Sequence, residues 1–381
     1  MQAQFQSEVE AETEPADEKP PGRGGDWRWQ LNHRIRSLQE LSILRPDLEI
    51  SSAMSAAAAR FPIAITPYYA GLIRKCNESD PVFRMAVPDA GELIESPDSV
   101  DDPLSEDEDM PVPGLVHRYA DRALLLVTSV CPVYCRHCTR KRVTGKAETC
   151  ITTERLHAAL DYIRANPSIH DVIVSGGDPL TLSTAFLENI ISKLRNIPHI
   201  DLIRIGTRTP VTLPMRITPE LVAMLKKYQP VWINTHFNHA AELSSQAIEA
   251  CHQIVDAGIP LGNQSVLLRG VNDNPETMIE LVRALVKNRI RPYYLFQCDL
   301  VYGVEHFRTP LSRGVEIMEA LRGRVSGFAI PLFVVDLPGG AGKVPVAPDY
   351  IVGSNDKCTV FRSFEGKISS YPEPLLDMGN V

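Results

Sequence analysis

The sequence predicts a partial (β/α)6 TIM-like barrel that follows a helical N-terminal region and precedes a C-terminal extension. Between residues 123 and 323, short apolar runs rich in β-branched residues alternate with segments of helical length. This alternation is typical of parallel strands joined by right-handed helical crossovers. Six such units, rather than eight, indicate a barrel that is not fully closed. Most polar motifs follow the expected strands, and barrels place their functional side chains at those strand ends.

Each expected strand is followed by an expected helix. The strands are predicted at residues 123–129, 171–177, 202–207, 231–237, 261–268 and 293–299. The helices are predicted at residues 153–165, 184–195, 219–227, 241–257, 275–288 and 311–323.

Composition divides the chain into four regions. Residues 1–25 predict a disordered acidic tail, because they offer too little apolar surface to offset the chain entropy lost on folding. Residues 26–114 predict several short helices and end in an acidic segment, 98–109, which we interpret as an exposed linker. The barrel is expected at 115–340, and a glycine-rich loop with a C-terminal extension at 341–381.

Charge and cysteine content limit the partners of this protein. Its 381 residues carry a formal net charge of -8, with the acids concentrated in two runs, so no broad basic face favours nucleic acid. No apolar run approaches the length of a membrane span. The eight cysteines are mostly scattered, which favours reduced thiols over a disulfide framework. We therefore predict a cytoplasmic protein without nucleic-acid or membrane partners.

Three cysteines cluster directly after the first expected strand. This cysteine trio, Cys131, Cys135 and Cys138, has the spacing C-x3-C-x2-C. A structural zinc ion needs four ligands, and a fourth ligand at His137 would strain so short a loop. Three thiolates on a [4Fe–4S] cluster would leave one iron open to a small molecule. We interpret the trio as cluster ligands, with zinc or inert thiols as the alternative.

This spacing after a first barrel strand resembles the signature of radical S-adenosylmethionine (SAM) enzymes. The resemblance implies that SAM chelates the open iron and that its reductive cleavage yields a 5′-deoxyadenosyl radical. The motif "SGGDP", residues 175–179, is similar to the glycine-rich element that binds SAM in that superfamily. An ordinary turn between a strand and a helix is the alternative interpretation of these glycines.

A second glycine-rich stretch, "PGGAGK", ends at Lys343. It is not a phosphate-binding loop of the Walker type, because its glycine spacing is wrong and Val344 replaces the Ser or Thr. Glycines can bring the backbone close to a flat phosphorylated cofactor while a lysine amine forms an imine with its aldehyde. The stretch therefore indicates pyridoxal 5′-phosphate (PLP), with a solvated surface loop as the alternative.

The ordered motifs from residue 26 to about residue 370 together resemble the lysine 2,3-aminomutase family. They include "DWRWQLNHRIR", "GTRTPVTLPMRIT", "NTHFNH", "GNQSVLLRGVND" and "PGGAGKVPV". The resemblance implies a radical SAM, PLP-dependent isomerase that moves the α-amino group of L-lysine from C2 to C3 and yields β-lysine. It also implies a reductant such as flavodoxin or ferredoxin, and a homo-oligomer.

The resemblance assigns roles to individual residues. It implies that the cysteine trio holds the cluster and that Lys343 binds PLP. Arg140 matches the residue that pairs with the substrate carboxylate, and Asp299 and Asp336 match the two that bind the ε-ammonium group. The remaining positions matched to SAM or PLP binding are Ser175, Gly176, Gly177, Asp178, His236, Gln264, Tyr119 and Arg122.

Three alternatives to a lysine aminomutase stay open. Arginine, which is also cationic, is not excluded as the substrate, and a related branch acts in the lysine modification of elongation factor P. A non-catalytic iron–sulfur or zinc protein is the third alternative. Clostridial members of the family tie their subunits through zinc with a cysteine-rich C-terminal segment. This chain ends without those cysteines, and Asn274 stands where their distant partner is expected, so we predict no structural zinc.

Overall fold

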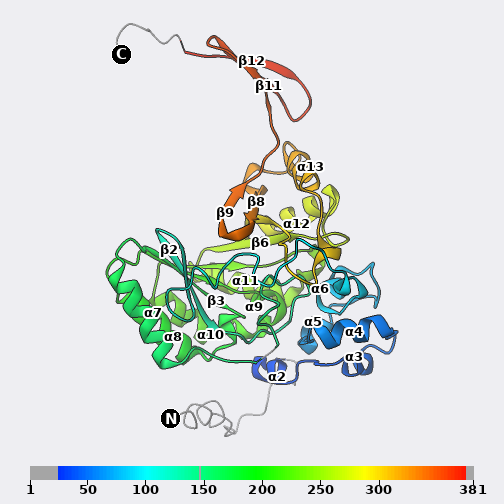
Figure 1. The fold of residues 1–381 in the computed structure, drawn as a ribbon, viewed down its shortest axis with the longest axis vertical. Helices are drawn as coiled ribbons and strands as arrows, with labels where there is room; N and C mark the ends of the chain where they lie inside the picture. The colour runs from blue at the N-terminus through cyan, green and yellow to red at the C-terminus, as the bar shows by residue number, and fades with distance from the viewer. Residues whose placement is uncertain (1–24, 146, 375–381) are drawn as a thin grey trace.

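A nine-stranded sheet forms the centre of the protein in the computed structural model, which describes residues 25–145 and 147–374 (Figure 1). Its strands follow one another in chain order, and β2 to β8 run parallel. Antiparallel β1 and β9 form its two edges. The strands are β1 (Leu115–Tyr119), β2 (Arg122–Thr128), β3 (Asp171–Gly176), β4 (Leu202–Gly206), β5 (Val231–Thr235), β6 (Leu261–Leu267), β7 (Arg291–Gln297), β8 (Leu332–Leu337) and β9 (Gly342–Pro345).

Helices on the chain between these strands bury an apolar face against the sheet. They are α7 (Thr153–Ala165), α8 (Thr184–Arg195), α10 (Pro219–Lys227), α11 (Ser245–Asp256), α12 (Pro275–Lys287) and α13 (Leu311–Leu321). All but α13 begin after a Ser, Thr or Asn whose side chain accepts a backbone hydrogen bond, which satisfies a donor of the first turn. In α8 the buried residues recur at helical spacing, at Leu187, Ile190, Ile191 and Leu194.

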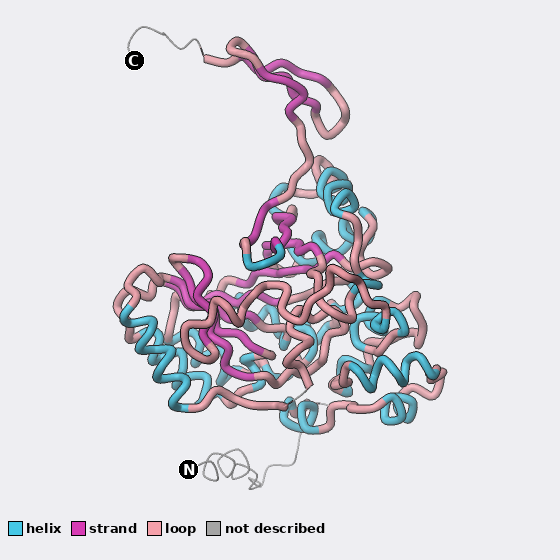
Figure 2. Tube along the Cα trace, viewed as in Figure 1, coloured by secondary structure: helices cyan, strands magenta, loops and turns pink. Residues whose placement is uncertain are grey.

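The predicted partial (β/α) barrel is confirmed, and its six strands and six helices lie where the sequence places them. The sheet is larger than expected because β8 adds a seventh parallel strand. The alternation does not reveal β8, since a second strand, β9, follows it instead of a helix. Figure 2 shows the strands of this sheet within the main body of the molecule, with helices around them.

The N-terminal region contains short helices, as predicted. They are α2 (Trp27–Asn32), α3 (Leu38–Leu44), α4 (Ser52–Arg60), α5 (Pro67–Ala70) and α6 (Pro81–Ala86). Pro67 and Pro81 stand in the first turns of α5 and α6, where the missing N–H costs nothing. Leu38, Leu41 and Tyr69 join the same hydrophobic core as the barrel strands. The predicted disordered tail lies, apart from residue 25, outside the described residues.

The acidic segment, residues 98–109, is not the exposed linker that the sequence predicts. Ser99 and Glu106 are buried. Val100 forms a parallel β-bridge with Val301, in the loop after β7. Basic side chains from the loop of the cysteine trio pair with the acids of this segment, and composition alone does not reveal those partners.

A separate antiparallel sheet follows the barrel. It consists of β10 (Ile351–Ser354), β11 (Cys358–Arg362) and β12 (Ile368–Pro372). Figure 1 shows this sheet projecting away from the barrel, and most of its side chains are exposed. Among the described residues, no helix combines the length and the apolar character that a bilayer crossing requires.

Candidate active site

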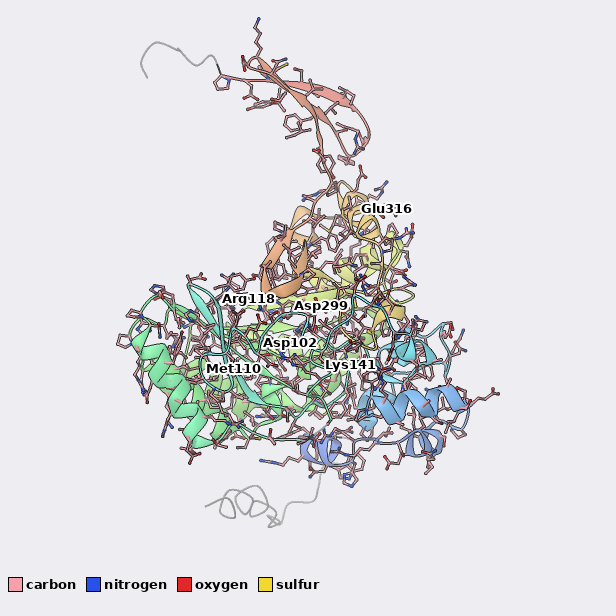
Figure 3. All side chains as sticks on the ribbon, viewed as in Figure 1. Asp102, Met110, Arg118, Lys141, Asp299 and Glu316 are labelled. Atoms are coloured by element: carbon pink, nitrogen blue, oxygen red, sulfur yellow. The ribbon has the colours of Figure 1, made fainter. Side chains whose placement is uncertain are left out.

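One cavity of about 1590 Å³ brings together every residue that the sequence analysis proposes for the site. The cavity lies inside the barrel, because interior-facing residues of β2 to β8 line it. The loops after β2 and β7 contribute the cysteine trio and Asp299. Figure 3 shows Asp299 near the centre of the molecule, whereas Glu316 on α13 lies higher in the same view.

Two arginines fasten the loop of the cysteine trio to neighbouring parts of the chain. Arg34 donates a hydrogen bond to the carbonyl oxygen of Cys131 over 2.6 Å and forms an ion pair with Glu148 at 2.7 Å. Arg136, which stands between two cysteines in the sequence, forms a buried ion pair with Glu92 at 2.6 Å. The three cysteines therefore line the cavity, whereas Arg136 between them points into the protein and pairs with Glu92.

The chemistry of the three thiols fits an iron–sulfur cluster. Burial raises the pKa of Cys131 well above its ordinary value, and the neighbouring Cys138 raises it further, so ionised thiols here require a nearby positive centre. Arg208 Nη1 lies 2.8 Å from Cys135 Sγ and donates a hydrogen bond to it.

A single metal ion fits the site less well. In the described part of the chain, no group of three or more His, Cys, Asp or Glu side chains is placed to hold one ion. In a four-iron cluster each thiolate binds a different iron, so the sulfurs stand further apart than the ligands of one ion. The cysteine trio therefore suits a cluster rather than zinc.

The turn after β3 packs directly against the loop that carries the cysteines. Gly176 has a φ of +132°, and a Cβ atom there would lie 2.2 Å from the carbonyl oxygen of Thr128. A Cβ atom on Gly177 would lie 2.4 Å from the carbonyl oxygen of Val130. Only glycine permits this approach. The Asp178 carboxylate accepts hydrogen bonds from the Thr207 hydroxyl and other groups of the protein, so it holds the turn in place.

Lys343 meets Tyr119 and Arg122 where the two edges of the sheet approach each other. The backbone N–H of Lys343 donates a hydrogen bond to the Tyr119 hydroxyl over 3.0 Å. The guanidinium group of Arg122 lies 4.0 Å from the centroid of the Tyr119 ring. Lys343 Nζ lies 5.3 Å from the centroid of the Phe296 ring. An amine, aromatic faces and a cation suit a flat aldehyde cofactor that carries a phosphate.

Asp299 and Asp336 form an acidic pair in the same cavity. Burial raises the pKa of Asp299 to about 6, and the charge of Asp336 contributes in the same direction. Thr139 donates its hydroxyl hydrogen to Asp299 over 2.6 Å, and Lys343 Nζ donates to Asp336 over 2.8 Å. Two close carboxylates are costly unless a cation lies beside them. Lys343 supplies that cation at Asp336, and a ligand that brings an ammonium group would supply one to both carboxylates when the Lys343 amine is bound to a cofactor instead.

Arg140, His236 and Gln264 complete the set of predicted residues that line the cavity. Arg140 forms an ion pair with the buried Glu106 at 2.6 Å. Burial lowers the pKa of His236 to about 4, so this imidazole is neutral at neutral pH and can donate one hydrogen bond and accept another.

Sequence reasoning missed three side chains that contact the predicted residues. They are Glu106, Thr139 and Arg208. Thr139 could have been found from its position between Cys138 and Arg140. Glu106 could have been found because its acidic segment and the basic stretch "TRKR" carry opposite charges. Nothing in the sequence links Arg208 to Cys135, because their contact depends on how two distant strand ends approach.

Two family models match this chain. One is described as "Radical SAM superfamily" and matches residues 125–282, and the other is described as "Lysine-2,3-aminomutase" and matches residues 318–378. An L-lysine 2,3-aminomutase from Clostridium subterminale is 54% identical over 351 residues, which cover 92% of this chain and 84% of that protein. The chain belongs to the lysine 2,3-aminomutase family.

Other relatives show how the family varies. An L-lysine 2,3-aminomutase from Bacillus subtilis is 48% identical, with 93% of this chain and 76% of that protein covered. A glutamate 2,3-aminomutase from Clostridioides difficile is 42% identical, with 94% of this chain and 86% of that protein covered. Membership in this family of radical SAM isomerases confirms the predicted [4Fe–4S] cluster, SAM and PLP. The roles of individual residues stay predictions.

Proposed function

We propose that this protein converts L-lysine into β-lysine by moving the α-amino group from C2 to C3. The observation that carries this proposal is the charge pattern of the cavity. Arg140 contributes a cation to the cavity lining, and Asp299 and Asp336 contribute two carboxylates. A free lysine offers a carboxylate for the guanidinium group and a distant ammonium for the two carboxylates.

The acidic pair also supports lysine over glutamate, on which one relative acts by name. The side chain of glutamate ends in a carboxylate, and two buried carboxylates would repel it. A glutamate aminomutase is expected to carry a cation or a neutral amide at these two positions. Arginine ends in a cation and would satisfy the same pair, so the experiment includes it.

Each cofactor would use a different group of cavity residues. The cysteine trio would hold the cluster, and Ser175, Gly176, Gly177, His236 and Gln264 would contact SAM. Lys343 would bind PLP, with Tyr119 and Arg122 beside it. Once bound, these groups supply a hydrogen-abstracting radical and an aldehyde that carries the migrating amino group. The task of the chain is then to hold the substrate and to exclude water, which the enclosing barrel favours.

The predicted partners and location are part of the same proposal. Reduction of the cluster requires an outside electron donor, and a flavodoxin or a ferredoxin would supply it. A homo-oligomer is supported by the projecting β10–β12 sheet, whose exposed apolar side chains include Val352 and Tyr371. We also propose a cytoplasmic location, where thiols such as the eight free cysteines of this chain stay reduced.

Anaerobic incubation with defined substrates tests the proposal. The reconstituted protein is supplied with SAM, PLP and dithionite, and lysine, arginine and glutamate are offered separately. We expect β-lysine as the product. Formation of β-arginine or β-glutamate without β-lysine would overturn the assignment.

A substitution at Asp336 tests the basis of the substrate choice. Asp336→Asn removes one of the two charges that would hold the ammonium group, so β-lysine formation should fall far more than the reductive cleavage of SAM to 5′-deoxyadenosine. Asp161→Asn, on the exposed face of α7, is the matched control and should change neither. Equal losses of the two activities in Asp336→Asn would contradict the assigned role.

A further inference from the structure

The acidic segment brings a buried carboxylate against one edge of Arg140. Glu106 Oε2 accepts a hydrogen bond from Arg140 Nε over 2.9 Å, and Glu106 Oε1 accepts one from Arg140 Nη2 over 2.6 Å. Both side chains line the cavity. A guanidinium group has five N–H donors in a fixed plane, and this contact uses only the Nε–Nη2 edge. The Nη1 donors remain for a second carboxylate.

Glu106 is held in place from both ends of its segment. Val100 donates a backbone hydrogen bond to the carbonyl oxygen of Leu300 over 2.9 Å, next to Asp299. On the other side, the Asp109 carboxylate accepts a hydrogen bond from Arg118 Nε on β1 over 2.7 Å. In Figure 3, Asp102 of this segment and Asp299 are both labelled near the centre of the view. A clamp built in this way does not need to reorganise when a ligand arrives.

The charge on Glu106 is stabilised by the arginines that it contacts. Its side chain is only 4% exposed, and burial alone would raise its pKa. The guanidinium groups of Arg140 and Arg142 more than offset burial, so the pKa of Glu106 lies below its ordinary value. Glu106 is therefore ionised at neutral pH and pairs with Arg140 as a full charge.

A flexible arginine loses rotamer freedom whenever it binds a ligand, and that loss weakens binding. A neighbouring carboxylate removes this cost in advance, provided that it occupies a different edge of the guanidinium group from the ligand. The side-on contact between Glu106 and Arg140 meets that condition. Without Glu106, the half-buried guanidinium group would lose its main partner and would be free to turn toward other acceptors.

We propose that Glu106 is a positioning residue that clamps the Nε–Nη2 edge of Arg140 and thereby aims its Nη1 donors at the carboxylate of the amino acid substrate. This inference rests on the proposed function, because it takes Arg140 as the receptor of that carboxylate. Glu106 contacts neither substrate nor cofactor in this role. The opposite arrangement, in which Glu106 competes with the substrate for Arg140, predicts a change of opposite sign.

The test compares Glu106→Gln with the unchanged protein, both carrying cluster and PLP. Titration with lysine, followed by the absorbance of bound PLP, gives a Kd that needs no radical step. We expect this Kd and the KM for lysine to rise roughly 10- to 100-fold, as for the loss of a charge-assisted contact, while kcat falls much less. Glu108→Gln makes the same chemical change at an exposed site of the same segment and should leave both constants unchanged.

A second pair of variants connects the effect to Arg140. In an Arg140→Lys background the side-on contact cannot form, so adding Glu106→Gln should change the Kd for lysine less than twofold. If Glu106→Gln fails to hold PLP, then Glu106→Asp, which keeps the charge on a shorter side chain, provides the same comparison and should show an intermediate rise. An unchanged or lowered Kd in these variants, or an effect that persists fully without Arg140, would overturn the inference.

The same data separate this inference from the proposed function. If the unchanged protein neither binds nor isomerises lysine, the proposed function fails and the role of Glu106 fails with it. If the unchanged protein makes β-lysine and the Glu106 variants bind lysine normally, only the role of Glu106 is lost.

Discussion

The hydroxyl group of Thr139 donates a hydrogen bond to the Asp299 carboxylate over 2.6 Å and so joins the loop of the cysteine trio to the loop after β7. Thr139 lies between Cys138 and Arg140 in the sequence. Three successive residues thus serve three parts of the proposed site. Cys138 is a proposed cluster ligand, Thr139 contacts the proposed ammonium-binding pair, and Arg140 is the proposed receptor of the carboxylate. A shift of this loop would disturb all three together.

Thr139→Val removes that hydrogen bond while keeping the size and branching of the side chain. Because the bond stabilises the ionised carboxylate, its loss should raise the pKa of Asp299 further and weaken lysine binding at neutral pH by roughly tenfold. The Kd for lysine, measured through the PLP absorbance, checks this expectation. Thr139→Ser retains the hydroxyl and should restore binding. Weak binding in both variants would point to packing rather than to the hydrogen bond.

Lysine binding should depend on pH through Asp299. The pKa of this carboxyl group is raised to about 6, so it is ionised above that pH and can attract an ammonium group. Below pH 6 it is protonated and neutral, and the Kd for lysine should rise as the pH falls. A titration of the Kd for lysine between pH 5 and pH 8 measures the change. The Asp299→Asn variant should bind lysine weakly, and its Kd should not change near pH 6. A change of Kd near pH 6 that persists in this variant would belong to another group.

Arg208→Lys should change the reduction potential of the cluster. Arg208 Nη1 donates to Cys135 Sγ over 2.8 Å, and hydrogen bonds to cluster sulfurs favour the reduced state. Losing one should lower the midpoint potential by roughly 50 mV, which for one electron is about 1 kcal/mol. A potentiometric titration followed by electron paramagnetic resonance measures it. Arg204→Lys is the control, because Arg204 also lines the cavity but pairs with Asp171.

Glu92→Gln should destabilise the protein by about 3–5 kcal/mol, because it leaves buried cations without their partner. Arg136 Nη2 and Lys141 Nζ lie 2.6 Å and 2.7 Å from Glu92, which is fully buried. Urea unfolding of the cofactor-loaded protein measures the free energy of unfolding. Glu95→Gln breaks an exposed pair with Arg60 and should cost less than about 1 kcal/mol. Similar values for the two variants would mean that the buried pair adds little.

The barrel was predictable because its elements are local patterns. The helix α8 and the strand β3 can each be predicted from a few residues, because their apolar residues have the expected spacing and a Ser or Gly stands at one end. The strand β8 was missed, because the rule that found the others requires a helix to follow.

The site was predictable only in part, for a different reason. The cysteine trio and Lys343 carry their chemistry in short motifs. The proposed role of Glu106 depends on its contact with Arg140, which is 34 residues away in the sequence. Composition predicts an exposed linker for its acidic segment because it does not show which charged side chains will form ion pairs. Burial of an acid becomes favourable only when its arginine partners are in place.

Asp336 on β8 and Lys343 on β9 are direct cross-strand partners, joined by a tight connection in which Gly339 and Gly340 take left-handed backbone conformations. Successive side chains of a strand alternate between its two faces, so inserting or deleting one residue in this connection would turn the amine out of the barrel. Such a change should abolish PLP binding at Lys343 while leaving the hydrophobic core intact. The number of residues in this short hairpin is therefore as important for the proposed PLP site as Lys343 itself.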